Sequence, residues 1–164
     1  MARRRVEGVG NYVHQLALRL PVLAPEIEFL LLTDRPIDAS RLPVGCRQVV
    51  VGLAFAEGGV RAKAYSPFWM NCVVPRVLAY EKVTLFHGTN YALPAVGHCR
   101  YVLTIHDIAF ISVPSAFSLV HRSYLRSLVR MGVQRADHVV VGSEAARDDI
   151  APMRGVEFNR LSVI

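Results

Sequence analysis

The chain has few cysteines and no long apolar run, and both absences narrow its class. Its 164 residues include Cys46, Cys72 and Cys99, an odd number with no Cys-x-x-Cys spacing. This pattern argues against a disulfide framework or a zinc site and favours a reducing compartment. No apolar stretch reaches the roughly 18 residues that a membrane-spanning helix needs. Residues 1–7 lack the apolar core of a signal peptide, so we expect a cytoplasmic protein, peripheral at most to the inner face of a membrane.

Acidic residues are also in the minority. The chain carries 13 Asp and Glu against 19 Lys and Arg, a formal net charge of +6, and most of the basic residues are arginines. A basic excess suits anionic partners, such as phosphorylated substrates or an anionic membrane surface. No helix-turn-helix, zinc-finger or RNP-like pattern occurs, so nucleic acid is not an expected partner.

What the chain does have is an alternation of strand-like and helix-like segments. Strands are predicted at residues 28–33, 46–51, 83–86, 101–105, 138–141 and 161–164, and helices at 7–20, 66–80, 118–135 and 143–153. Short connections between them predict an α/β fold, a Rossmann-like parallel sheet with helices on both faces. We expect one domain over residues 1–164. Pro21 should end the first helix, and Pro75 should kink a second helix that Ser66 caps.

The run from residue 101 to 105 leads straight into His106 and Asp107. A continuous apolar run reads as a strand buried on both faces, and its carboxyl end is where open parallel sheets bind ligands. There, His106 can act as a general base or orient a hydroxyl or phosphate. The alternative is structural: the histidine hydrogen-bonds a loop backbone and Asp107 caps a turn. For a His-Asp pair alone, that structural role is the commoner one.

Two more predicted strands end in polar sequence, at His87 to Asn90 and at Ser143, which suits a helix N-cap. The Gly8-x-Gly10 pair opens the first helix, where backbone N–H groups can approach an anion. The same pair also occurs in tight turns without a ligand. We expect the glycine pair, Asn90 and His106 to share one rim of one sheet.

Other chemistries fit the residues less well. His87, His106 and Asp107 lack the close ligand spacing of a metal site. Ser143 lacks the Gly-x-Ser-x-Gly elbow of a hydrolase, which disfavours a triad with the His-Asp pair. Three arginines repeat every four residues on the helix at 118–135 and read as a solvated face more readily than as a phosphate site: Arg122, Arg126 and Arg130.

Four blocks occur in a characteristic order: Gly-Val-Gly-Asn-Tyr-Val (8–13), Leu-Phe-His-Gly-Thr-Asn-Tyr-Ala-Leu-Pro (85–94), Thr-Ile-His-Asp-Ile-Ala-Phe (104–110) and Arg-Ala-Asp-His-Val-Val-Val-Gly-Ser-Glu (135–144). Together they resemble the N-terminal domain of family 4 glycosyltransferases, especially mannosyltransferase-like bacterial members. The resemblance implies a GT-B architecture, in which two Rossmann-like domains face each other. It also implies retaining sugar transfer from a nucleotide-sugar to a glycan or glycolipid acceptor, with no metal or other cofactor.

The resemblance also implies roles for individual residues. Gly8 and Gly10 match the loop whose amides approach the donor diphosphate or the transferred sugar. His106 matches the histidine that touches the donor sugar near its reacting carbon, and Asp107 matches its partner. Two further polar positions match the lining of the cleft: Asn90 and Ser143.

The sequence departs from the family pattern at both ends. A strand normally precedes the glycine pair, and residues 1–7 are not strand-like, so that strand is either missing or truncated. The donor-binding domain is also not found in the chain. We therefore expect the acceptor-side half of a glycosyltransferase, inactive without its donor-binding partner domain. The alternative is a non-catalytic Rossmann-like binding or interaction domain.

Overall fold

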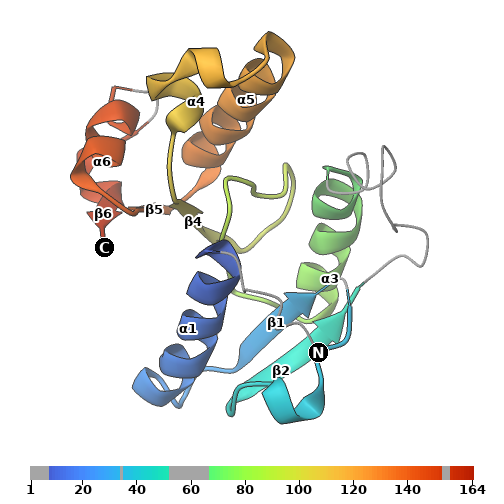
Figure 1. The fold of residues 1–164 in the computed structure, drawn as a ribbon. Helices are drawn as coiled ribbons and strands as arrows, with labels where there is room; N and C mark the ends of the chain where they lie inside the picture. The colour runs from blue at the N-terminus through green and yellow to red at the C-terminus, as the bar shows by residue number, and fades with distance from the viewer. Residues whose placement is uncertain (1–7, 34, 52–66, 153–155) are drawn as a thin grey trace, which may run out of the picture. The chain divides into compact units, whose positions relative to one another are not determined.

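The computed structural model describes residues 8–33, 35–51, 67–152 and 156–164 (Figure 1). They fall into two compact units, Met1–Tyr65 and Ser66–Ile164. The α/β fold class is confirmed, because every strand pairing is parallel and helices flank the strands. In the described ranges the strands form two sheets rather than the single sheet expected. The expected loss of a first strand, and the cap at Ser66, concern residues outside these ranges.

The first unit contains one helix and a two-stranded sheet. Helix α1 spans Gly8–Leu23 and packs on β1, Phe29–Thr33, which pairs in parallel with β2, Cys46–Val50. A short 3₁₀ turn, Ala39–Arg41, lies between the strands. Both strands were predicted to within one residue at each end.

Helix α1 continues two residues beyond Pro21, where the sequence predicted its end. A proline has no N–H, so Pro21 leaves the carbonyl of Ala17 without its usual helical donor. In this structure the Cys46 thiol donates to that carbonyl, with 3.4 Å between sulfur and oxygen. Burial raises the pKa of the Cys46 thiol, which keeps the S–H group available as a donor. The helix therefore tolerates Pro21 because a strand residue takes over the lost hydrogen bond.

The second unit is a four-stranded parallel sheet in which neighbours in sequence are neighbours in space. The strand order is β3, β4, β5, β6. The strands span Leu85–Gly88, Arg100–Ile105, His138–Val141 and Leu161–Val163. Helices α3, α4, α5 and α6 span Val74–Tyr80, Ala109–Ser112, Leu119–Arg135 and Glu144–Ile150, with 3₁₀ turns at Pro114–Ala116 and Phe158–Arg160.

The core of this unit lies between one face of the sheet and helices α5 and α6. Side chains alternate along a strand, so Leu103 and Ile105 of β4 share a face, and both are fully buried. Val129 and Val133 of α5 belong to the same buried cluster. Each such side chain contributes about 1.5–3 kcal/mol when fully buried. The register of β4 is therefore well specified, because a slip by one residue would turn this set away from the core.

The helix predicted from residue 66 contains a π-helical turn, Trp69–Val73, directly before α3. Pro75 cannot donate a backbone hydrogen bond, and the wider turn carries the chain past it. A π turn adds one residue, which rotates the following face by about 100°. The buried face of α3 therefore contains Leu78, while Tyr80 is 85% exposed.

Replacing Gly132 by alanine tests the packing of α5 on β4. In an exposed helix interior this change stabilises a protein by about 0.5–1 kcal/mol. At Gly132 an added Cβ would lie 2.8 Å from Cδ2 of Leu103 and 3.0 Å from the carbonyl oxygen of Tyr91. We therefore expect Gly132→Ala to lower the free energy of unfolding by roughly 1–3 kcal/mol in urea titrations. Ser127→Ala, at an exposed position of the same helix, is the control and should not destabilise. Equal stabilisation by both changes would contradict the described packing.

Candidate functional site

The carboxyl ends of β3, β4 and β5 meet at one edge of the second sheet. The parallel register pairs Gly88 with Leu103, and Ile105 with Val141, so the three strands end side by side. The segments that leave this edge carry four of the predicted site residues: Asn90, His106, Asp107 and Ser143. Ligands of open parallel sheets bind at this edge.

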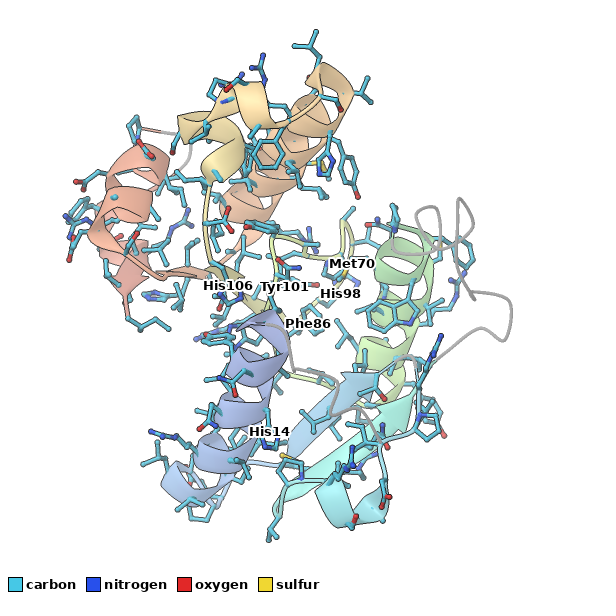
Figure 2. The ribbon with its side chains drawn as sticks, viewed as in Figure 1. His14, Met70, Phe86, His98, Tyr101 and His106 are labelled. Atoms are coloured by element: carbon cyan, nitrogen blue, oxygen red, sulfur yellow. The ribbon has the colours of Figure 1, made fainter. Side chains whose placement is uncertain are left out.

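His106 is held against the end of the neighbouring strand. It follows β4 directly and is half-buried (Figure 2), and its Nε2 atom lies 2.9 Å from the carbonyl oxygen of Thr89. A carbonyl only accepts, so Nε2 donates and carries the ring hydrogen, and Nδ1 of the neutral ring is an acceptor. The contact therefore orients the imidazole and selects its tautomer, which is what a general base or a hydroxyl-binding histidine needs.

Asp107 is exposed and has a local structural role. Its Oδ1 atom accepts a hydrogen bond of 3.1 Å from the backbone N–H of Ala109, where α4 begins. Burial, and then the negative charge of Asp107, raise the pKa of the Tyr91 phenol to about 12. Both contacts of the structural alternative are thus present, since His106 bonds a loop carbonyl and Asp107 caps a turn. These contacts also fix both side chains at the edge where a ligand would bind.

A second histidine lies on the same face of the sheet and was not assigned a role from sequence. Nε2 of His87 is 2.7 Å from Oγ1 of Thr104, whose side chain is almost fully buried in β4. Burial, and then the neighbouring His106, lower the pKa of His87. The register places His87 opposite Val102, so His87, Thr104 and His106 share one face. The sequence offered one signal for the contact between His87 and Thr104: Thr104 is a polar residue within the apolar run at residues 101–105.

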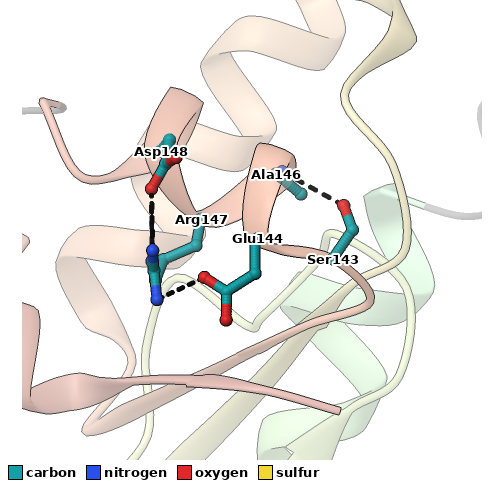
Figure 3. Close-up of polar contacts among 5 residues, drawn as sticks. All are labelled: Ser143, Glu144, Ala146, Arg147 and Asp148. Atoms are coloured by element: carbon teal, nitrogen blue, oxygen red, sulfur yellow. Dashed lines mark hydrogen bonds and ion pairs between the residues drawn. The ribbon is translucent and has the colours of Figure 1, made fainter.

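Ser143 begins α6, as predicted. Its hydroxyl oxygen accepts from the backbone N–H of Ala146 at 3.1 Å (Figure 3). In the same turn Arg147 pairs with the carboxylates of Glu144 and Asp148. The hydroxyl of Ser143 and the carboxylate of Asp107 thus both cap local turns. These contacts are not those of a nucleophile and its base, in line with the sequence, which disfavoured a triad.

Gly8 and Gly10 lie in the first turn of α1, in the other unit, and both are exposed. The first turn of a helix leaves backbone N–H groups without helical partners. An added Cβ at Gly8 would meet nothing within 4 Å, so its backbone is open to approach. That the glycine pair shares a rim with His106 stays a prediction.

The described residues also bear on the expectations for metal ligands, cysteines and membrane-spanning helices. Within the described ranges, no three His, Cys, Asp or Glu side chains gather closely enough to hold a metal ion. Cys72 and Cys99 are free thiols, and both are half-buried. Of the helices that the structure describes, none has both the length and the apolar character to cross a bilayer.

The fold and this strand-end site define an α/β domain of the kind that binds ligands at the carboxyl edge of a parallel sheet. The family model for Glycosyltransferase Family 4 matches residues 6–164, so the chain belongs to this family. It is also similar to the O-antigen chain mannosyltransferase RfbU of Salmonella typhimurium, with 32% identity over 97 residues. That match covers 59% of this chain and 26% of RfbU, so the matched part spans about a quarter of the length of this relative.

The lowered pKa of His87 predicts a dependence of stability on pH. The unfolded chain binds a proton at this position near the ordinary pKa of about 6.5, whereas the folded state resists protonation. Stability is therefore fully present above about pH 6.5 and is lost as pH falls toward the lowered pKa. We expect the free energy of unfolding to fall less between pH 7.5 and 5.5 in His87→Gln than in the original chain.

Urea titrations at the two pH values measure this difference. His98→Gln, at an exposed position of the same unit, is the matched control and should keep the original pH dependence. An unchanged pH dependence in His87→Gln would show that this imidazole does not couple protonation to folding.

Proposed function

We propose that this chain is the acceptor-side domain of a retaining glycosyltransferase. It would transfer a sugar from a nucleotide-sugar donor to a glycan or lipid-linked acceptor. The observation that carries the proposal is the strand-end edge, where an oriented imidazole, an exposed carboxylate and an exposed amide gather in a member of family 4. Sugars present several hydroxyl groups, and such groups are recognised by a few well-placed polar side chains.

The proposed roles follow from the donors and acceptors at this edge. Nδ1 of His106 accepts a hydrogen bond from a sugar hydroxyl near the reacting carbon, while Thr89 holds the opposite ring nitrogen. The amide of Asn90 contacts a second hydroxyl. The first-turn amides at Gly8 and Gly10 face the diphosphate, because helix N-termini stabilise anions. No metal or other cofactor is assigned a step.

Transfer is proposed to need a nucleotide-binding domain in addition to residues 1–164. This rests on the short span of the match, about a quarter of the length of RfbU. The name of that relative makes a nucleotide-activated mannose the first donor to test. The full-length gene product that contains these residues, or this chain with a family 4 donor domain, is the appropriate sample.

His106→Ala is expected to reduce donor-nucleotide release by about 100-fold or more, the usual loss when one preorganised hydrogen-bonding group is removed near a reacting centre. His106→Gln is the sharper variant, because its side-chain amide can still donate to Thr89 but offers no acceptor at the position of Nδ1. We expect a similar loss in both. Nucleotide release is measured with acceptor present, and circular dichroism checks the fold.

The matched control is His98→Ala, at an exposed position before β4. Full activity in His106→Gln would remove the imidazole from the chemistry and leave it a structural role. That result would favour the second candidate, a non-catalytic binding domain. The hydrogen bonds of His106 and Asp107 to nearby backbone groups are consistent with this candidate. Sugar-nucleotide binding without release would then be expected.

We also propose that the outward face of α5 makes the expected peripheral contact with an anionic membrane. Helix α5 contains no acidic residue. Val120, Tyr124 and Met131 recur at i, i+4 and i+11, so they share one face, and all three are exposed. Arg126 and Arg130 are exposed on the same helix, roughly 100–140° around its axis from this face. Apolar side chains with flanking arginines fit the interface of anionic lipids.

Vesicle sedimentation tests this surface. Each arginine near an anionic bilayer contributes about 1 kcal/mol, so Arg126→Gln with Arg130→Gln should weaken binding to phosphatidylglycerol-containing vesicles by roughly 30-fold. Arg19→Gln with Arg41→Gln removes the same charge from other exposed positions and is the control. Equal weakening by both pairs, or equal binding to pure phosphatidylcholine, would contradict a specific role for α5.

A further inference from the structure

Thr104 of β4 is hydrogen-bonded at two points to the chain around the end of β3. Its hydroxyl oxygen lies 2.7 Å from Nε2 of His87, and its carbonyl accepts from the backbone N–H of Tyr91 at 3.3 Å. His87 and Tyr91 lie two residues before and two residues after Thr89. The carbonyl of Thr89 is the group that accepts the hydrogen bond of His106. Thr104 therefore anchors both ends of the segment 87–91, whose central carbonyl orients the imidazole.

A hydroxyl group is an unexpected feature at the position of Thr104. The residue is 1% exposed, and a valine would have nearly the same shape without a polar group to bury. Burial of a hydroxyl is unfavourable unless the group is hydrogen-bonded. A hydroxyl can both donate and accept, so it can pair with either tautomer of His87. The contact with His87 satisfies the hydroxyl and, at the same time, fixes the end of β3 against β4.

The same kind of pair occurs a second time on this face of the sheet. Nε2 of His138 in β5 lies 2.8 Å from Oγ of Ser162 in β6. The register aligns His138 with His87 across β4. It also aligns Ser162 with Thr104 across β5, so both pairs run diagonally from one strand to the next. The second pair is remote from the segment 87–91, and it therefore serves as a reference for what such a pair contributes to the sheet alone.

We propose that Thr104 is a positioning residue, which orients the imidazole of His106 by holding the segment 87–91 against β4. The inference rests on the proposed glycosyl transfer, since that reaction gives the orientation a chemical purpose. Thr104 is buried in the sheet and acts through the Thr89 carbonyl, without touching a substrate. Without the hydroxyl, this carbonyl is held less firmly and selects the ring tautomer less strictly. Nδ1 of His106 is then a fixed acceptor for a smaller fraction of the time.

Thr104→Val tests this role, because it removes the hydroxyl and keeps the shape of the side chain. We expect it to lower kcat about tenfold, the order of one lost hydrogen bond, and to change KM less than about twofold. The sample is the one used for nucleotide release. In ¹⁵N spectra the two ring nitrogens of His106 should move towards each other, as expected when both tautomers become populated. His106→Gln identifies these signals by their loss.

Three further variants complete the experiment. Thr104→Ser keeps the hydroxyl and should retain both kcat and the ¹⁵N pattern of His106. Ser162→Ala breaks the reference pair with His138 and should change neither quantity. His87→Phe removes the other half of the pair with Thr104, and it replaces Thr104→Val if that variant does not fold. The double variant with Thr104→Val should lose no more kcat than either single change, because the two groups act as one unit. Thermal midpoints check the fold of each variant.

The two readouts separate the inference from the function on which it rests. An unchanged ¹⁵N pattern of His106 in folded Thr104→Val, or in folded His87→Phe, overturns the positioning role. Equal losses of kcat in Thr104→Val and Ser162→Ala overturn it as well, because the cost would then belong to the sheet. If the original protein releases no nucleotide, the proposed function fails, while the ¹⁵N pattern still reports whether Thr104 orients His106.

Discussion

The pairing of β4 with a neighbour on each side is the constraint on which the second unit depends. Leu103 and Ile105 are fully buried on one face, and Thr104, on the other, is nearly so. The chain therefore cannot slip along its neighbours without exposing apolar side chains and burying unpaired polar ones. This register places His106, which directly follows β4, beside the end of β3. There its imidazole hydrogen-bonds the carbonyl oxygen of Thr89.

The candidate edge shows how a structural role and a chemical role can reside in the same side chain. Asp107 caps α4, and His106 is bonded to a loop, so each contributes to the local fold. Those contacts also remove rotational freedom, and a group that must meet a sugar in one orientation benefits from having lost it beforehand. Local hydrogen bonding at His106 is thus compatible with membership of family 4 and with the proposed transfer.

Much of the fold could be predicted because its signals are local. The apolar run His138–Val141 was predicted to the residue, and Ser143 caps α6 as predicted, accepting from the N–H of Ala146. The features that sequence reasoning missed depend on partners far along the chain. The Cys46 thiol donates a hydrogen bond to the carbonyl of Ala17, which Pro21 leaves without its helical donor. No local sequence pattern predicts this contact. The division of the strands into two sheets likewise depends on which strands pair with each other, and local sequence signals do not determine that.

The candidate site was also predictable only where its signals are local. A histidine at the end of an apolar run pointed to the edge of the sheet, but its partner could only be found once two strands were paired in register. The chain-order succession of β3, β4, β5 and β6 has a further consequence for how this unit is made. Each strand that emerges during synthesis finds its docking site already built by the one before it. The sheet can therefore extend in one direction, from β3 to β6, and each step needs only the connection between two successive strands to close.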